Sequence, residues 1–300
     1  MFRIGVDLGG TKTEVAIIDS DGHTRYSRRE ATPEYYESKI RLITHLVGLA
    51  EKSVERDSLP VGVGHPGSLN PVSGLMRNSN SAALNGRPLD KDLEAALGRP
   101  VRCANDANCF ALSESVDGAG KSAKSVFGVI LGTGVGGGLV VDGRIHEGHG
   151  LLGGEWGHPS LPWPSIGEVP GPDCKCGLSG CVESWISGPA FAADHTRETG
   201  RTFTADQIVT NAEAGDAGAK AALNRLQDRL ARGLATVINI VDPEVIVLGG
   251  GLSNIPDLAE ETARRLPGYV FSDRMTTRIV RNLHGDSSGV RGAAWLWPLS

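Results

Sequence analysis

The sequence predicts an α/β protein of two lobes with a cleft between them. Three observations lead to this prediction. Each half of the chain opens with an apolar strand, a glycine turn and a second apolar strand, first at residues 2–19 and again at residues 125–143. Segments with helical spacing of apolar residues lie between the strands that follow. A late apolar strand ends in three consecutive glycines at residues 249–251.

In the first half, strands and helices alternate. The stretch "FRIGVDLGGTKTEVAIID" places β-prone apolar residues on both sides of a glycine pair. Apolar residues spaced by three and four predict a helix over residues 33–54. A buried strand is predicted at residues 59–67, ending in a Pro-Gly turn. A short strand then leads into a helix that begins near residue 105.

The second half repeats this layout. "SVFGVILGTGVGGGLVVDG" is again strand, glycine turn and strand, and the shared arrangement indicates a duplicated architecture. Leucines and isoleucine between residues 223 and 238 predict a long amphipathic helix. We predict one lobe from residues 1–118 with 288–300 and the other from residues 119–287. The 41 glycines follow apolar runs and are interpreted as turn residues.

Composition excludes several classes of protein. The 300 residues are 40% hydrophobic and 22% charged, with a net charge of −5, which is ordinary for a globular protein. No basic run supports nucleic-acid binding. No signal-peptide layout and no membrane-spanning apolar run occurs, so a cytoplasmic protein without a membrane partner is expected. Five cysteines argue against a disulfide framework and leave metal binding open.

The first glycine turn is surrounded by charged and hydroxyl side chains. Asp7, Thr11 and Lys12 flank Gly9 and Gly10. Backbone N–H groups in such a turn can converge on a phosphate, and Lys12 adds a positive charge. Asp7 is suited to hold a hydrated Mg²⁺ that bridges phosphates. A tight turn also needs glycine for its backbone alone, so a purely structural role stays open.

The other two glycine turns carry no charge. Gly132-Thr133-Gly134 offers a similar backbone surface, and residues 249–251 offer a flat one against which a purine could lie. Neither matches a known phosphate loop. No glycine precedes Lys-Ser/Thr at P-loop spacing, and "GTGVGGG" runs into a strand rather than the helix of a dinucleotide fingerprint.

One loop combines thiols, an imidazole and carboxylates. Within "GEWGHPSLPWPSIGEVPGPDCKCGLSGCVE" (residues 154–183) stand His158 and the cysteines Cys174, Cys176 and Cys181. Three thiols and one imidazole are a standard tetrahedral zinc set. Redox-active thiols remain the alternative. The carboxylates that flank the loop could also be ordinary surface groups.

An ordered set of motifs resembles the ROK family of bacterial sugar kinases. The motifs are "DLGGTKTE", "GHPGSLNP", "ANDANCFALSE", "ILGTGVGGGL", "GEWGH", "CKCGLSGCVE" and "DPEVIVLGGGLSN". With "GDSSGVRGAAW" near the C-terminus, they cover essentially the whole chain. They resemble fructokinase/mannokinase-type members most, and N-acetylglucosamine kinases next. The resemblance implies a pair of RNase H-like lobes of the actin/hexokinase type, with an active-site cleft between the lobes and a zinc-bound loop.

The resemblance also implies site residues. Asp106 would accept the proton of the sugar hydroxyl, although an Asp at a helix start can also be a simple N-cap. The implied sugar-binding residues are Gly67, Asn80, Asn105, Asp106, Glu155, His158 and Glu183. The implied nucleotide-side residues are Asp7, Gly9, Gly10, Thr11, Lys12, Gly132, Thr133, Gly134, Gly249, Gly250 and Gly251. The implied ligands of a structural zinc are His158, Cys174, Cys176 and Cys181.

The implied reaction is the ATP- and Mg²⁺-dependent phosphorylation of the 6-hydroxyl of a free hexose. D-Fructose is the first predicted substrate, with mannose and glucose plausible, and N-acetylglucosamine is the alternative. A homodimer is expected from the family. The family also includes sugar-responsive repressors, but the first predicted strand begins at Phe2, which leaves no room for an N-terminal DNA-binding domain. His65 departs from the family pattern and is interpreted as a packed core residue.

Overall fold

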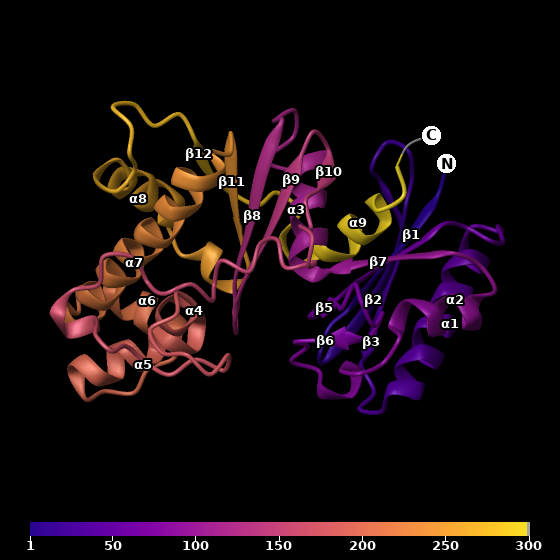
Figure 1. The fold of residues 1–300 in the computed structure, drawn as a ribbon, viewed down its shortest axis with the longest axis horizontal. Helices are drawn as coiled ribbons and strands as arrows, with labels where there is room; N and C mark the ends of the chain where they lie inside the picture. Colours follow the sequence, from indigo (N-terminus) through magenta and orange to yellow (C-terminus); the bar gives the residue numbers. More distant parts are fainter. Residues whose placement is uncertain (299–300) are drawn as a thin grey trace. The chain divides into compact units, whose positions relative to one another are not determined.

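The computed structural model describes residues 1–298, which divide into two units (Figure 1). The first unit contains Met1–Ser122, Gly138–Gly153 and the segment that begins at His284; the second contains Ala123–Gly137 and Gly154–Leu283. The predicted boundaries differ from this division mainly in residues 138–153, which belong to the first unit. The reason is that the hairpin formed there packs against the helix that starts at Asp106.

The first unit contains a mixed five-stranded sheet. Its strands, in spatial order, are β3 (Thr24–Ala31), β2 (Lys12–Ile18), β1 (Arg3–Leu8), β4 (Val61–His65) and β7 (Val101–Asn105). β2 is antiparallel to β1 and β3, whereas β4 is parallel to β1 and β7. Between β4 and β7 along the chain, β5 (Ser68–Leu69) and β6 (Met76–Arg77) form a separate two-stranded sheet. The predicted strand, glycine turn and strand at residues 2–19 are confirmed.

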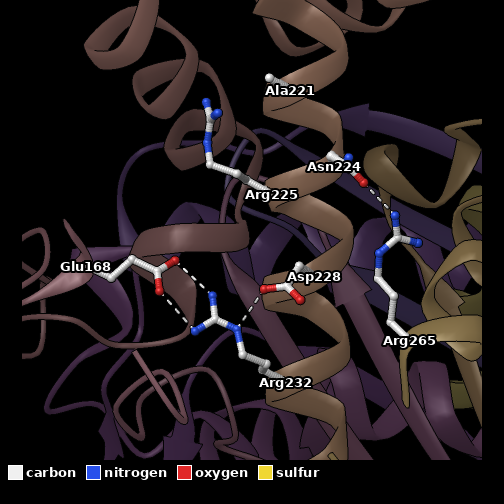
Figure 2. A pocket seen from close by; sticks show the side chains of 7 residues that line it. All are labelled: Glu168, Ala221, Asn224, Arg225, Asp228, Arg232 and Arg265. Carbon is white, nitrogen blue, oxygen red and sulfur yellow. Dashed lines mark hydrogen bonds and ion pairs between the residues drawn. The ribbon is translucent and has the colours of Figure 1, made fainter. Parts of the chain in front are cut away.

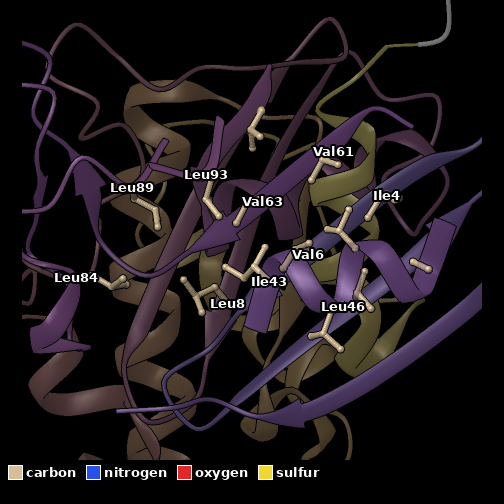
Figure 3. Packing of buried hydrophobic residues seen from close by; sticks show 14 of the residues in the cluster. Ile4, Val6, Leu8, Ile43, Leu46, Val61, Val63, Leu84, Leu89 and Leu93 are labelled. Carbon is tan, nitrogen blue, oxygen red and sulfur yellow. The ribbon is translucent and has the colours of Figure 1, made fainter. Parts of the chain in front are cut away.

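One face of this sheet carries the hydrophobic core of the unit. Ile4, Val6 and Leu8 alternate along β1 and are buried together with residues of α1 (Tyr36–Ser53) and α2 (Leu89–Leu97), as Figure 3 shows. On α1 the buried apolar residues are spaced by three and four, which confirms the predicted helix.

The opposite face of the sheet is built on glycine. A Cβ on Gly5 would overlap the carbonyl oxygen of Val290, and one on Gly62 would overlap that of Ala293. The backbone of α9 (Ser288–Trp295) therefore lies directly on β1 and β4. The general interpretation of glycines as turn residues is wrong for these two. They lie inside strands, because only glycine lets helix backbone approach a sheet this closely.

The remaining helix of the first unit is α3 (Asp106–Val116), which packs against α9 and confirms the helix predicted near residue 105. Glu114, fully buried on α3, accepts a hydrogen bond from the hydroxyl of Ser288 at 2.8 Å. This contact joins α3 to the first turn of α9.

The second sheet has the same strand order as the first. Its strands, in spatial order, are β10 (Arg144–Ile145), β9 (Val135–Val141), β8 (Ser125–Leu131), β11 (Val245–Gly249) and β12 (Arg278–Arg281). In both sheets the first strand along the chain is central, the second and third lie on one side, and the fourth and fifth lie on the other. β11 is parallel to β8 and β12. This shared order confirms the predicted duplicated layout.

Five helices belong to the second unit. They are α4 (Glu183–Ile186), α5 (Gly188–Thr199), α6 (Ala205–Glu213), α7 (Ala217–Val241) and α8 (Leu258–Arg265). α7 is the predicted long amphipathic helix, and α4, α5, α6 and α8 all pack against it (Figure 1). Between residues 1 and 298, no helix combines the length and the apolar character that crossing a bilayer requires.

Candidate active site

The start of α3 holds the predicted base. Asn105 is the N-cap of the helix, and its Oδ1 accepts a hydrogen bond from the N–H of Ala107 at 2.9 Å. Oδ1 of Asp106, the first helical residue, lies 2.8 Å from the same N–H. The sequence left open whether Asp106 is only an N-cap. In the structure the N-cap residue is Asn105. The positive end of the helix dipole lies at this position, where it attracts negative charge.

Two further predicted sugar-binding positions lie next to this helix start. Nδ2 of Asn105 donates to the carbonyl oxygen of Gly67 at 3.1 Å. Gly67 has φ +78°, and a Cβ there would lie 2.5 Å from the carbonyl oxygen of Arg77 and 2.7 Å from the N of Ser79. The segment that leads into exposed Asn80 therefore rests on Gly67. The structure brings these predicted residues of the first unit together.

Asp7, at the end of β1, faces other carboxylates. Burial raises the pKa of its carboxyl to about 7, with further contributions from Asp106 and Glu14, while Arg29 opposes the rise. Glu14 stands directly opposite Asp7 on β2, and its Oε2 accepts from Nε of Arg29 at 2.9 Å. The sequence analysis missed both residues. Glu14 directly precedes the apolar residues 15–18 in the sequence. A charged side chain in a buried strand needs a partner, so this position could have indicated a charged site.

The first glycine turn offers fewer donors than predicted. The N–H of Gly9 donates to the carbonyl oxygen of Lys12 at 3.0 Å, and the hydroxyl of Thr32 donates to the carbonyl oxygen of Gly9 at 2.9 Å. These bonds close the turn and use both the N–H and the carbonyl oxygen of Gly9. Gly10, Thr11 and Lys12 are exposed at its tip. An anion would therefore meet residues 10–12 and not Gly9.

In the second unit, the two uncharged glycine turns are neighbours. The N–H of Gly132 donates to the carbonyl oxygen of Gly134 at 2.9 Å, which closes the turn after β8. Gly250 has φ +80°, and a Cβ there would lie 2.5 Å from the carbonyl oxygen of Leu131. The turn after β11 thus rests on the end of β8. Around Gly251 a Cβ would meet no atom within 4 Å, in keeping with the open surface predicted there.

Glu183 lies against the Gly132–Gly134 turn. It is the first residue of α4 and only 9% exposed. Its Oε2 accepts from the N–H of Val135 at 2.8 Å, and a Cβ on Gly134 would lie 2.7 Å from the same oxygen. Its Oε1 lies 3.3 Å from Nζ of Lys175, a residue that the sequence analysis passed over. This predicted sugar ligand is therefore a fixed carboxylate.

The four predicted metal ligands converge. Nδ1 of His158 lies 3.5 Å from Sγ of Cys174, Sγ of Cys176 lies 3.6 Å from Sγ of Cys181, and all four donor atoms lie within 4.8 Å of one another. Tetrahedral zinc, with Zn–S of about 2.3 Å and Zn–N of about 2.0–2.1 Å, requires donor separations of about 3.6 Å (N to S) and about 3.8 Å (S to S). The residues therefore fit zinc in both chemistry and spacing.

Glu155 extends this cluster toward solvent. Nε2 of His158, the ring nitrogen on the side away from Cys174, lies 4.0 Å from Oε2 of Glu155. The side chain of Glu155 is 45% exposed. The N–H of Glu183, just after the cysteine loop (residues 174–181), donates to the carbonyl oxygen of Gly157 at 2.8 Å, and the N–H of Val182 donates to that of Pro159 at 3.0 Å. These two bonds hold the segment around His158 next to the end of the loop.

His65 and the two remaining cysteines, Cys103 and Cys109, are packing residues. His65 is 2% exposed, and burial lowers its pKa to about 4, so the imidazole is neutral at pH 7. Burial also raises the pKa of the Cys109 thiol well above its usual range and that of Cys103 to about 12. Neither thiol is activated as a nucleophile. The interpretation of His65 as a core residue is supported.

A charged cavity of about 410 Å³ lies elsewhere in the second unit. Figure 2 shows Arg232 held between Glu168 and Asp228, and Arg265 turned toward Asn224. The lining residues are Glu168, Ala221, Asn224, Arg225, Asp228, Arg232 and Arg265. None of them is a predicted site residue, and the guanidinium groups are paired with carboxylates or amide oxygens. The charged groups that line the cavity form an ion-pair network that joins α7 to its neighbours.

Comparison with known proteins gives consistent matches over the whole length. A model of the ROK family matches residues 3–299. The N-acetyl-D-glucosamine kinase of Pasteurella multocida (strain Pm70) is 38% identical over 302 residues, covering 99% of each chain. That of Citrobacter koseri is 39% identical over 297 residues, covering 97% of this chain and 98% of its own.

Solved structures agree with this pattern. The ROK hexokinase from Thermus thermophilus has a TM-score of 0.85 and 32% identity, covering 98% of this chain and 97% of its own. A ROK family glucokinase from Streptomyces griseus, solved in complex with glucose and AMPPNP, has a TM-score of 0.81 and 26% identity, with 99% of each chain covered.

Proposed function

The chain belongs to the ROK family, and from this premise we propose that it is an ATP-dependent N-acetylglucosamine kinase. The observation that carries the proposal is the identity of 38–39% to N-acetyl-D-glucosamine kinases over nearly the full length of both chains. At the coarser level the chain is a sugar kinase. D-Fructose, the first prediction from sequence, has no support from these relatives, and the alternative becomes the leading substrate.

The change of substrate has a physical reason. The motifs that identify the family would surround the phosphates, the reacting hydroxyl and the cysteine loop, which its kinases share whatever sugar they phosphorylate. Discrimination between sugars depends on the space and donors around C2, where N-acetylglucosamine carries an acetamide and glucose a hydroxyl. Those features depend on the three-dimensional lining of a pocket, so short motifs are a poor guide to them.

In the proposed reaction, Asp106 is the proton acceptor. Phosphoryl transfer to an alcohol requires alignment, charge neutralisation and a base for the hydroxyl proton. The Asp106 carboxylate, at the start of α3, would take the proton from the 6-hydroxyl as the hydroxyl oxygen bonds to the γ-phosphorus of ATP. The bond from the γ-phosphorus to the β,γ-bridging oxygen breaks in the same step, and ADP leaves. Asn105, held by Gly67, would orient the sugar beside it.

The other predicted roles are retained as proposals. Asp7 would hold the water shell of Mg²⁺, which supplies charge neutralisation at the phosphates, and Lys12 would contact a phosphate. The turns 132–134 and 249–251 would form the nucleotide side. Glu155, His158 and Glu183 would accept or donate hydrogen bonds to sugar hydroxyls. The cysteines and His158 would hold a structural zinc. Assembly as a homodimer and a cytoplasmic location stay predictions.

The test is a coupled kinase assay with N-acetylglucosamine, glucose, mannose and fructose, each with ATP and Mg²⁺. We expect kcat/KM to be largest for N-acetylglucosamine, with the 6-phosphate identified by ³¹P NMR of the product. Asp106→Asn serves as the matched control for contaminating kinases. A larger kcat/KM for fructose would overturn the substrate assignment but not the sugar-kinase assignment.

A further inference from the structure

An ion pair joins the cysteine loop to a predicted sugar ligand. Nζ of Lys175 lies 3.3 Å from Oε1 of Glu183. The other carboxylate oxygen, Oε2, is occupied by the N–H of Val135 at 2.8 Å. The two oxygens of Glu183 are thus held by different partners, one from the backbone after a glycine turn and one from the cysteine loop.

The two partners differ in exposure. The side chain of Glu183 is 11% exposed, whereas that of Lys175 is 63% exposed. An ion pair between two exposed groups contributes little. Here, however, the carboxylate is largely removed from water, and the ammonium lies at the oxygen that the backbone N–H does not hold. The pair therefore restricts the orientation of Glu183.

Lys175 projects from a closed turn. The N–H of Cys174 donates to the carbonyl oxygen of Leu178 at 2.8 Å, and the N–H of Gly177 donates to the carbonyl oxygen of Cys174 at 3.0 Å. The backbone that carries Lys175 is therefore defined by hydrogen bonds of its own. A lysine on such a turn loses less freedom on pairing than one on an open loop.

We propose that Lys175 is a positioning residue for the sugar, whose ammonium orients Glu183 so that Oε1 accepts a hydrogen bond from a sugar hydroxyl. This inference rests on the proposed function. A carboxylate oxygen has two lone pairs, so Oε1 can accept from the ammonium and from a hydroxyl at once. Lys175 acts through Glu183 and has no part in proton or phosphoryl transfer.

The experiment compares Lys175→Gln with Lys175→Arg in steady-state kinetics. We expect Lys175→Gln to raise KM for the sugar about two- to fivefold, the range of a partly exposed ion pair. KM for ATP and kcat should change less than the sugar KM. Lys175→Arg, which retains the charge and can reach Oε1, should restore the sugar KM. Raising the salt concentration should raise the sugar KM of the wild type more than that of Lys175→Gln.

Two controls separate this role from a general effect on charge or folding. Lys220→Gln removes an exposed lysine of α7, far along the chain from the cysteine loop, and should leave all constants unchanged. In a double-mutant cycle, Lys175→Gln should add little to Glu183→Gln, because its effect passes through that carboxylate.

The outcomes are distinguishable. An unchanged sugar KM in Lys175→Gln, or equal increases for sugar and ATP, overturns the positioning role while the proposed function stands. If the wild-type protein prefers another sugar, the same comparison is made with that sugar. Absence of both turnover and calorimetric sugar binding in the wild type overturns the proposed function, and the role of Lys175 with it.

Discussion

Nδ1 of His158 lies 3.5 Å from Sγ of Cys174, while Nε2 of the same ring lies 4.0 Å from Oε2 of Glu155. One imidazole therefore connects the thiol cluster to a predicted sugar ligand. A metal on Nδ1 would define the tautomer and the plane of the ring, and so make Nε2–H a donor with a fixed direction.

From this arrangement we expect removal of zinc to act mainly on the sugar. Cys176→Ser, or treatment with a chelator, should raise KM for the sugar about 10-fold or more, the usual effect of disturbing a metal site. KM for ATP should change much less. Metal content is measured alongside by atomic absorption. Equal effects on both substrates would contradict the coupling between the thiol cluster and the sugar ligands.

Asp106→Asn should retain the fold and lose transfer. Asn105 supplies the helix cap, so the substitution leaves α3 intact, while loss of a general base lowers kcat about 10²- to 10⁴-fold. Thermal unfolding should show a nearly unchanged Tm. The matched variant is Asn105→Ala, which removes the cap and should cost about 1 kcal/mol of stability. A near-normal kcat in Asp106→Asn would remove the base assignment.

Asp7→Asn should abolish activity and raise the stability of the protein above pH 7. The folded pKa of Asp7 is about 7, raised from 3.8, so the folded state binds this proton more tightly than the unfolded state. The wild type therefore loses stability as the pH rises from about 4 to 7. The variant has no such loss, and at pH 8 it should be more stable by about 1–2 kcal/mol, since partial exposure reduces the full effect.

The measurement is urea unfolding of both proteins at pH 4.5 and pH 8. The stability difference should be small at the lower pH and favour the variant at the higher one, while use of Mg·ATP is lost. A stability difference that does not depend on pH would contradict the raised pKa.

Gly62→Ala should destabilise the first unit strongly. Its methyl group would overlap the carbonyl oxygen of Ala293, so α9 must move off the sheet, at a cost of about 3 kcal/mol or more. The matched control is Gly48→Ala in the middle of α1, where a Cβ meets no atom within 4 Å. That change should stabilise by about 0.5–1 kcal/mol. The free energy of unfolding of both variants is measured by chemical denaturation. A Gly62→Ala variant as stable as Gly48→Ala would contradict the close approach of α9 to the sheet.

Much of the fold follows from the sequence because it depends on local order. Alternation along residues 3–18, helical spacing in α1 and α7, and the glycine turns each reflect neighbours a few residues apart. The Cys₃His set could also be predicted, since close spacing of three cysteines leaves few arrangements. The structure places these four donors within 4.8 Å of one another.

Other relationships arise only when distant segments pack. Nothing near Gly5 or Gly62 in the sequence indicates that a side chain there would clash. The clash arises because α9, more than 200 residues later, packs on both glycines. Glu14 meets Asp7 through strand register, and Lys175 meets Glu183 through the path of the cysteine loop. Local patterns along the chain are therefore enough to predict the helices, the strands and the chemical groups typical of the family. Tertiary structure decided which groups face one another, because close approach, burial and charge pairing depend on atoms that local patterns do not bring together.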